Sequence, residues 1–176
     1  ALLTRYLNVK QRKNAGKDGE QFAERLIKSV SKDGDIVLKN VELDYEGRKT
    51  ELDFLIVNRN GVFIIEVKNY SGRIEGLEND NEWRKYHVSR GGNVYYKSVR
   101  NPVKQVKREV DILSRLLRSK GFKVWIEGYA FVFCDDMRVS SERIILNESQ
   151  LERIIHTPGR KPPDNNTVNG IVDLFD

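Results

Sequence analysis

Hydrophobic residues recur with two different spacings along the chain, and the spacing predicts which segments are helices and which are strands. Over residues 18–30 the apolar side chains fall on one face of a helix, and Asp18 with Gln21 forms a capping-box-like start. Three apolar runs at 36–43, 50–58 and 61–69 are separated by short turn sequences, which predicts consecutive antiparallel strands. A cap followed by proline, Asn101-Pro102, predicts a second helix that ends near residue 120.

The rest of the chain is less regular. Residues 70–98 hold glycine turns and short strand-like pieces, which predicts a β-rich excursion. A long strand (124–134), a short strand (143–146) and a short helix (148–156) are expected to follow the second helix. We therefore expect three parts: a basic N-terminal arm over residues 1–15, one domain over 16–157, and a C-terminal linker with a short terminal segment over 158–176.

The strand predicted over residues 61–69 is apolar, yet it carries Glu66 and Lys68. Successive side chains on a strand point to opposite faces, so these two residues share a face. Burying charges is costly unless they are paired, hydrogen-bonded or bound to a metal. This strand is therefore a candidate active site.

The hairpin before this strand brings a third charged residue, Asp53, to the same face. Two registers are open: Asp53 lies opposite Glu66 if Asn58 pairs with Gly61, and opposite Lys68 if the pairing is shifted by two residues. Either register predicts a cluster of the three charged side chains.

Two carboxylates that converge from adjacent strands form a hard, oxygen-rich site of the kind that Mg²⁺ prefers. Asp53 and Glu66 would bind the metal, with the backbone carbonyl of Val67 as a further ligand, and Glu51 is a second-tier candidate on the same face. Lys68 would assist an attacking water or neutralise the charge that builds on a phosphate. The same spacing also fits an acid–lysine pair that only stabilises a half-exposed sheet.

Charge favours a polyanionic partner: the chain has 31 basic and 26 acidic residues, a net charge of +5. Basic residues interleave with aromatics between residues 70 and 100, which suits either a nucleic-acid surface or ordinary half-exposed strands. The first half of the second helix is also basic, and a positive helix terminus favours phosphate. The candidate nucleic-acid contacts are Lys17, Arg73, Arg100, Lys104, Lys107 and Arg108. The single cysteine excludes an internal disulfide, and the lack of a long apolar segment predicts a cytoplasmic protein without membrane contact.

Short motifs from residue 16 to 120 occur in an order that resembles a known family. The acid on the second strand and the Glu-x-Lys on the third resemble the PD-(D/E)XK nuclease superfamily, and the local motifs resemble its NERD (nuclease-related) domain. These motifs are Gly19-Glu20, Glu51-Leu52-Asp53, Gly61-Val62-Phe63, Glu66-Val67-Lys68-Asn69, Ser71-Gly72, Trp83 and Asn101-Pro102-x-x-Gln105.

The resemblance implies an α/β fold with a restriction-endonuclease-like αβββαβ core, in which helices flank a central mixed β-sheet. It also implies a catalytic role for Lys68, metal ligation by Asp53 and Glu66, a third acid from Glu20, and a helix-borne polar group from Gln105. By periodicity alone, Glu20 is as well explained by the helix dipole, and Gln105 lies off the main apolar stripe. Related nucleases often have an aromatic residue one turn after that glutamine, where this chain has Glu109.

The expected activity is Mg²⁺-dependent hydrolysis of DNA as an endonuclease or nickase, with Mn²⁺ as a substitute metal, RNA as an alternative substrate and a homodimer as an option. Two other hypotheses remain. The first is a nucleic-acid-binding module that kept the fold without catalysis, and the second is an interaction domain whose ion pairs only specify the sheet.

Overall fold

The computed structural model describes residues 5–8 and 17–176. A six-stranded mixed sheet forms the centre, in the spatial order β1-β2-β3-β4-β8-β10. Strands β2, β3 and β4 are antiparallel neighbours, whereas the β1–β2, β4–β8 and β8–β10 pairs are parallel. The strands are β1 (Arg5–Asn8), β2 (Ile36–Tyr45), β3 (Arg48–Asn58), β4 (Gly61–Asn69), β8 (Ile126–Phe133) and β10 (Ile144–Ile145).

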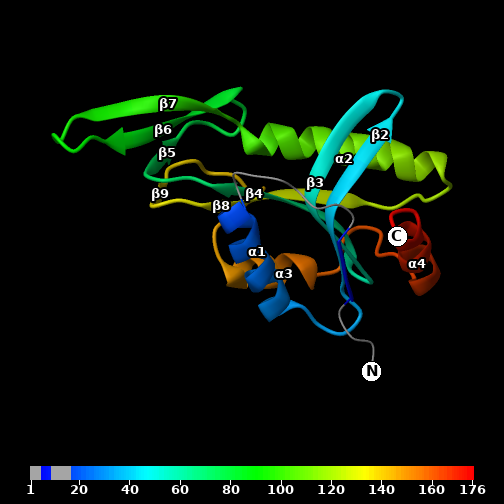
Figure 1. The fold of residues 1–176 in the computed structure, drawn as a ribbon. Coiled ribbons are helices and arrows are strands. Elements are labelled where there is room, and N and C mark those ends of the chain that lie inside the picture. Colours follow the sequence, from blue (N-terminus) through cyan, green and yellow to red (C-terminus); the bar gives the residue numbers. More distant parts are fainter. Residues whose placement is uncertain (1–4, 9–16) are drawn as a thin grey trace.

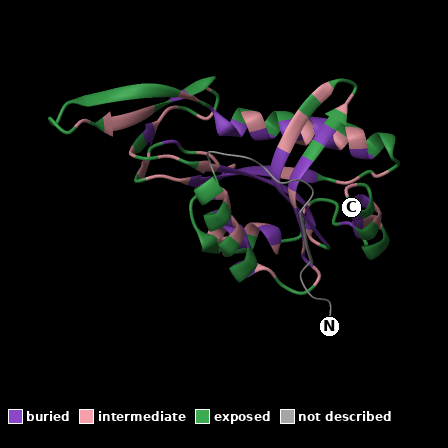
Figure 2. Ribbon diagram, viewed as in Figure 1, coloured by how far each residue is buried: buried purple, intermediate pink, exposed green. Residues whose placement is uncertain are grey.

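Helices cover both faces of this sheet (Figure 1). Successive residues of the central strands pack into two hydrophobic cores on opposite faces of the sheet, as Phe63 and Ile64 do on β4. Figure 2 shows the buried positions concentrated in the central strands and on the helix sides that meet them. The α/β fold with a mixed sheet flanked by helices is confirmed. On one face lie α2 (Pro102–Ser119) and α4 (Asn165–Asp173), and on the other lie α1 (Lys17–Val30) and α3 (Glu148–Ile155).

The β-rich excursion and the short strand β9, which follows β8 in the chain, form a second sheet, ordered β7-β6-β5-β9. Its base packs on a third core through Ile74 and Trp83, next to Val103 at the start of α2. Beyond this base the β6–β7 hairpin extends from the body of the molecule (Figure 1). The strands are β5 (Arg73–Glu75), β6 (Glu82–Val88), β7 (Val94–Arg100) and β9 (Asp136–Met137).

Both ends of the chain add elements that the hydrophobic pattern did not indicate. Within the N-terminal arm, β1 extends the main sheet beside β2, while residues 1–4 and 9–16 lie outside the described residues. The C-terminal segment contains a helix, α4, capped by Asp164. Val168, Ile171 and Val172 of this helix are buried in the core between α2 and the sheet. The terminal segment is thus part of the main core rather than an appendage.

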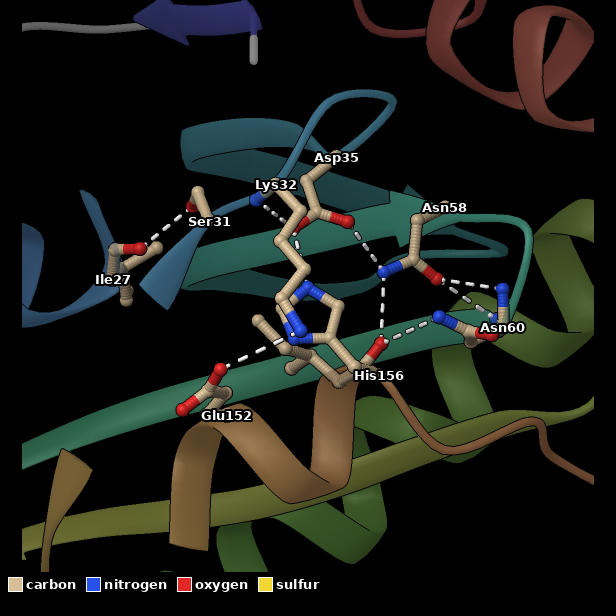
Figure 3. Close-up of polar contacts among 10 residues, drawn as sticks. Ile27, Ser31, Lys32, Asp35, Asn58, Asn60, Glu152 and His156 are labelled. Atoms are coloured by element: carbon tan, nitrogen blue, oxygen red, sulfur yellow. Dashed lines mark hydrogen bonds and ion pairs between the residues drawn. The ribbon is translucent and has the colours of Figure 1, made fainter. Parts of the chain in front are cut away.

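A buried cluster of hydrogen-bonded polar side chains connects one end of the sheet to the end of α3 (Figure 3). The Asn58 side-chain amide donates to Asp35 Oδ1 at 2.8 Å and to the Ile155 carbonyl at 2.9 Å, and His156 Nε2 lies 2.8 Å from Asp35 Oδ2. These contacts join β2, β3 and α3 at the end of the sheet where β4 begins, so the cluster has a structural role. Among the helices that the structure describes, none is long and apolar enough to cross a membrane.

Candidate active site

The β3–β4 hairpin fixes the position of Asp53. Asn58 pairs with Gly61, so the first of the two possible registers is correct. Regular pairing ends at Phe54–Ile65, and immediately beyond it Asp53 Oδ2 accepts a hydrogen bond from the backbone N–H of Val67 at 2.8 Å. The buried carboxylate thus replaces a backbone acceptor between the two strands.

Strand alternation is interrupted at Asp53. Leu52 and Phe54 are two residues apart, yet they pack into the cores on opposite faces of the sheet. On the neighbouring strand, Asn40 has a φ of 55°, a left-handed conformation that asparagine tolerates better than most residues. Regular alternation predicted the correct neighbourhood for Asp53, but this irregularity and the bond to Val67 set its orientation.

Glu66 is the centre of the site. Its side chain is buried, and its Oε1 accepts hydrogen bonds from Lys68 Nζ and from Gln105 Nε2, both at 2.7 Å. Lys68 lies two residues along β4, whereas Gln105 comes from the first turns of α2. Glu66, Lys68 and Gln105 are therefore brought together on the α2 face of the sheet.

A further carboxyl group, Glu109, lies beneath these residues and is fully buried. Its Oε1 accepts a hydrogen bond from Gln105 Nε2 at 3.0 Å. Burial and, next in size, the negative charge of Glu66 raise the pKa of Glu109 to about 8. The sequence singled out Glu109 only as a departure from the related nucleases. Its spacing of four residues from Gln105 on a helix was the signal that it would join the site.

Tyr70 was also not among the site residues predicted from the sequence. It follows β4 directly, and burial raises its pKa to about 12, with further contributions from the charges of Glu66 and Cys134. Its hydroxyl group therefore stays protonated beside Glu66 at neutral pH.

The donor atoms of the site fit a hard divalent cation. Within the described residues, Glu66 Oε2 is buried and has no hydrogen-bond partner. Asp53 binds the N–H of Val67, the residue after Glu66, so carboxylates from two adjacent strands offer the oxygen ligands that Mg²⁺ prefers. Over the described residues as a whole, no group of three or more His, Cys, Asp or Glu side chains is arranged to hold a metal ion. The structure thus places two of the predicted carboxylates, Asp53 and Glu66, on adjacent strands, and among the described residues no third acid joins them in metal-binding geometry.

Glu20 approaches this region from the other face of the sheet. It is half-buried in the first turn of α1, a helix that packs on the side opposite to Gln105. A Cβ atom at Gly19 would lie only 2.7 Å from the Cβ of Asn69, so the absence of a side chain at Gly19 allows α1 to begin against the end of β4. Glu20 is placed near the end of the Glu66–Lys68 strand.

Three of the six candidate nucleic-acid contacts line a groove of about 940 Å³ that also contains Gln105. They are Arg100, Lys104 and Arg108. The other three have different surroundings. Lys17 is exposed at the start of α1, and Arg73 and Lys107 form ion pairs with Glu75 and Glu78, respectively.

Comparison with known proteins agrees with this architecture. The model of the nuclease-related domain (NERD) family matches residues 15–133. An uncharacterized protein of Bacillus anthracis, pXO1-01, is 36% identical over 69 residues, a match that spans 39% of this chain and 32% of that protein. No solved structure matched the chain. Since the family match covers well over half of the sequence and includes the site described above, the chain belongs to the nuclease-related domain family.

Proposed function

We propose that this protein hydrolyses phosphodiester bonds of DNA in a Mg²⁺-dependent reaction, as an endonuclease or nickase. The observation that carries the proposal is the state of Glu66. This buried carboxylate is held through one oxygen by Lys68 and Gln105, and its other oxygen has no hydrogen-bond partner among the described residues. Burying such a group is costly, and a bound cation would offset the cost.

Asp53 and Glu66, with the Val67 carbonyl, would hold Mg²⁺, and Mn²⁺ would substitute. When bound, the ion would act as a Lewis acid and lower the pKa of a coordinated water. The bond from Val67 N–H to Asp53 Oδ2 keeps one carboxylate in place, and Gln105 does the same for the other. Glu20, at the start of α1, would complete the acidic surroundings.

Lys68 would be the side chain that acts directly on the attacking water or on the phosphate. Its ammonium lies 2.7 Å from Glu66 Oε1, and the side chain is 27% exposed, so substrate and water can reach it. In that position the lysine would hold the attacking water or neutralise negative charge on the phosphate. Gln105 would position Glu66, and the largely protonated Glu109 would avoid adding a third negative charge beside the other two carboxylates.

Plasmid cleavage tests the proposal. Supercoiled DNA is incubated with wild type, Asp53→Asn and Lys68→Ala, each with Mg²⁺ or with EDTA, and nicked and linear products are quantified. We expect cutting by the wild type with Mg²⁺ only, and a loss of at least a hundredfold in both variants. Equal cutting by all three proteins would indicate contamination and refute the assignment. A parallel assay with RNA decides between the two substrates.

The direct ion pair between Glu66 and Lys68 favours a second candidate function, a DNA-binding module without catalysis, because each charge already has a partner. This alternative predicts salt-dependent DNA binding with no cutting under any metal.

A further inference from the structure

The positive charge of the chain is concentrated on one element. Residues 83–100, which form most of the β6–β7 hairpin, contain five basic residues and no acidic residue. The other 158 residues hold the remaining 26 basic residues and all 26 acidic residues, so together they are neutral. The net charge of +5 thus equals the charge of residues 83–100, and Glu82 at the start of β6 lowers the charge of the whole hairpin to +4.

The register of the hairpin places like charges against each other. Lys85 on β6 pairs directly with Lys97 on β7. Like charges directly opposite each other destabilise an antiparallel pair. The next pair on the same face joins His87 to Tyr95, whose rings are stacked with centroids 5.4 Å apart. The hairpin therefore keeps an unfavourable pair of lysines beside an aromatic pair.

Basic residues lie on both faces of the hairpin. Arg84 and Lys85 lie where β6 pairs with β5, opposite Glu75 and Ile74, and the hairpin beyond this pairing is open to solvent. Arg84 lies on the face opposite to Lys85, and Arg90 lies in the turn at the tip. In the part of the chain that the structure describes, no carboxylate forms an ion pair with these three residues or with Lys97. Large side chains are also exposed near the tip: Val88, Val94, Tyr95 and Tyr96 are 69%, 63%, 48% and 57% exposed.

The hairpin is connected to the candidate active site through its base. The ammonium of Lys85 lies 5.9 Å from the centre of the Tyr70 ring, and Tyr70 in turn is close enough to Glu66 for its pKa to respond to that charge. Arg100, at the end of β7, lines the groove that contains Gln105. From Arg84 to Val88 the strand extends about 13 Å at the usual rise of a β-strand.

We propose that the β6–β7 hairpin is a DNA-binding arm that enters a groove of duplex DNA next to the scissile strand. The major groove admits a two-stranded β-ribbon, and it presents phosphates on both of its walls. Cations on both faces and at the tip, namely Arg84, Lys85, Lys97 and Arg90, suit those two walls. DNA as the partner rests on the proposed function; the surface itself is assigned from charge and register.

DNA binding measured in the absence of a metal ion, so that no cleavage occurs, tests the proposed role of the hairpin. A fluorescent 20-base-pair duplex is titrated in EDTA at several salt concentrations with wild type and with the variant in which Arg84, Lys85, Arg90 and Lys97 are all changed to glutamine. We expect at least a tenfold loss of affinity and a shallower dependence of log K on log [salt], by roughly 0.9 for each phosphate contact removed. A matched control neutralises four exposed basic residues elsewhere: Lys120, Lys123, Arg153 and Lys161.

A single charge reversal separates binding from folding. Lys97→Glu converts the like-charged pair into an opposite-charged one, so we expect a higher Tm together with weaker DNA binding. Undiminished affinity in this variant, or equal weakening in the control, would overturn the proposal. Tighter binding of single-stranded DNA of the same length would overturn the groove assignment in favour of base stacking on the tyrosines.

The outcomes for the arm and for catalysis are distinguishable. If the wild type binds through the arm but does not cut, the proposed nuclease activity fails and the arm stands. If the wild type cuts DNA and the four-glutamine variant binds like the wild type, the arm fails and the nuclease stands.

Discussion

The carboxyl groups of Glu66 and Glu109 share one donor, the side-chain nitrogen of Gln105, which lies 2.7 Å from one and 3.0 Å from the other. An amide nitrogen carries two hydrogens, so each carboxyl group receives one. The orientation of Gln105 is thereby fixed by two acids on different elements. A substitution at either acid is expected to affect the other through this nitrogen.

Glu109→Gln should change the pH dependence of stability. The folded pKa of about 8 lies above the ordinary value of 4.5, so the folded state retains a proton that the unfolded chain has released between these pH values. Stability from this group is therefore complete below about pH 4.5 and falls as the pH rises through 8. Glutamine does not titrate. Between pH 5 and 9 the free energy of unfolding of the variant should therefore rise relative to that of the wild type, by up to about 4 kcal/mol.

Urea unfolding of both proteins in EDTA across this range measures the difference. A difference in unfolding free energy that stays constant with pH would show that Glu109 does not titrate there.

Two substitutions at Asp53 should separate the effect of its charge from the effect of its hydrogen bond. Asp53→Asn keeps an oxygen acceptor for the Val67 N–H, whereas Asp53→Ala leaves that buried donor without a partner. We expect Asp53→Asn to change the unfolding free energy by less than about 1 kcal/mol, and Asp53→Ala to lower it by about 1–3 kcal/mol more. Both variants should lose DNA cleavage. Denaturant titration is the measurement, and equal stability of the two variants would contradict the role of the bond to Val67.

Asn58→Ala should be the most destabilising change in the polar cluster of Figure 3. The buried Asn58 side chain donates to Asp35 and to the Ile155 carbonyl, and it accepts from the N–H groups of Asn60 and Gly61. Its loss leaves several buried polar groups without partners, at a cost of about 2–4 kcal/mol. Asn60→Ala removes one side-chain bond, to Ile155, and serves as the control, with an expected loss of about 1 kcal/mol. Similar values for the two variants would argue against Asn58 as the centre of the cluster.

Gly128→Ala should be destabilising because α2 packs directly on the backbone of β8. A Cβ at this position would lie 2.2 Å from Val106 Cγ1 and 2.8 Å from Val110 Cγ2. The helix or the strand must shift, which costs about 1–3 kcal/mol. Adding Val106→Ala makes room, so the double variant should be more stable than the sum of the two single changes predicts, by about 1 kcal/mol. Strict additivity in thermal or urea unfolding would exclude the steric explanation.

Much of the fold follows from local features of the sequence. Asn101 begins α2 as predicted, because its side chain accepts from the N–H groups of Val103 and Lys104 and Pro102 needs no partner. The turn at Arg59-Asn60 left two registers for the hairpin. Asn58 Oδ1 accepts hydrogen bonds from the N–H groups of Asn60 and Gly61, and these bonds stabilise the pairing that the structure adopts.

The C-terminal helix α4 and the edge strand β1 did not follow from the pattern, because both depend on partners far away in the chain. The buried face of α4 has only three apolar residues, Val168, Ile171 and Val172, which is too few to stand out without the core that covers them. β1 is four residues long and is defined by its pairing with β2.

For the site, the sequence by itself determined the residue types and their periodicity: Glu66 and Lys68 on one face, Asp53 on the adjacent strand, and Gln105 one turn into a capped helix. Only the tertiary structure decided that Asp53 lies between the strands rather than on their face, because Asn40 on β2 breaks the alternation. Burial likewise gave Glu109 its raised pKa, since the desolvation of a carboxyl group depends on everything packed around it and not on its neighbours in sequence.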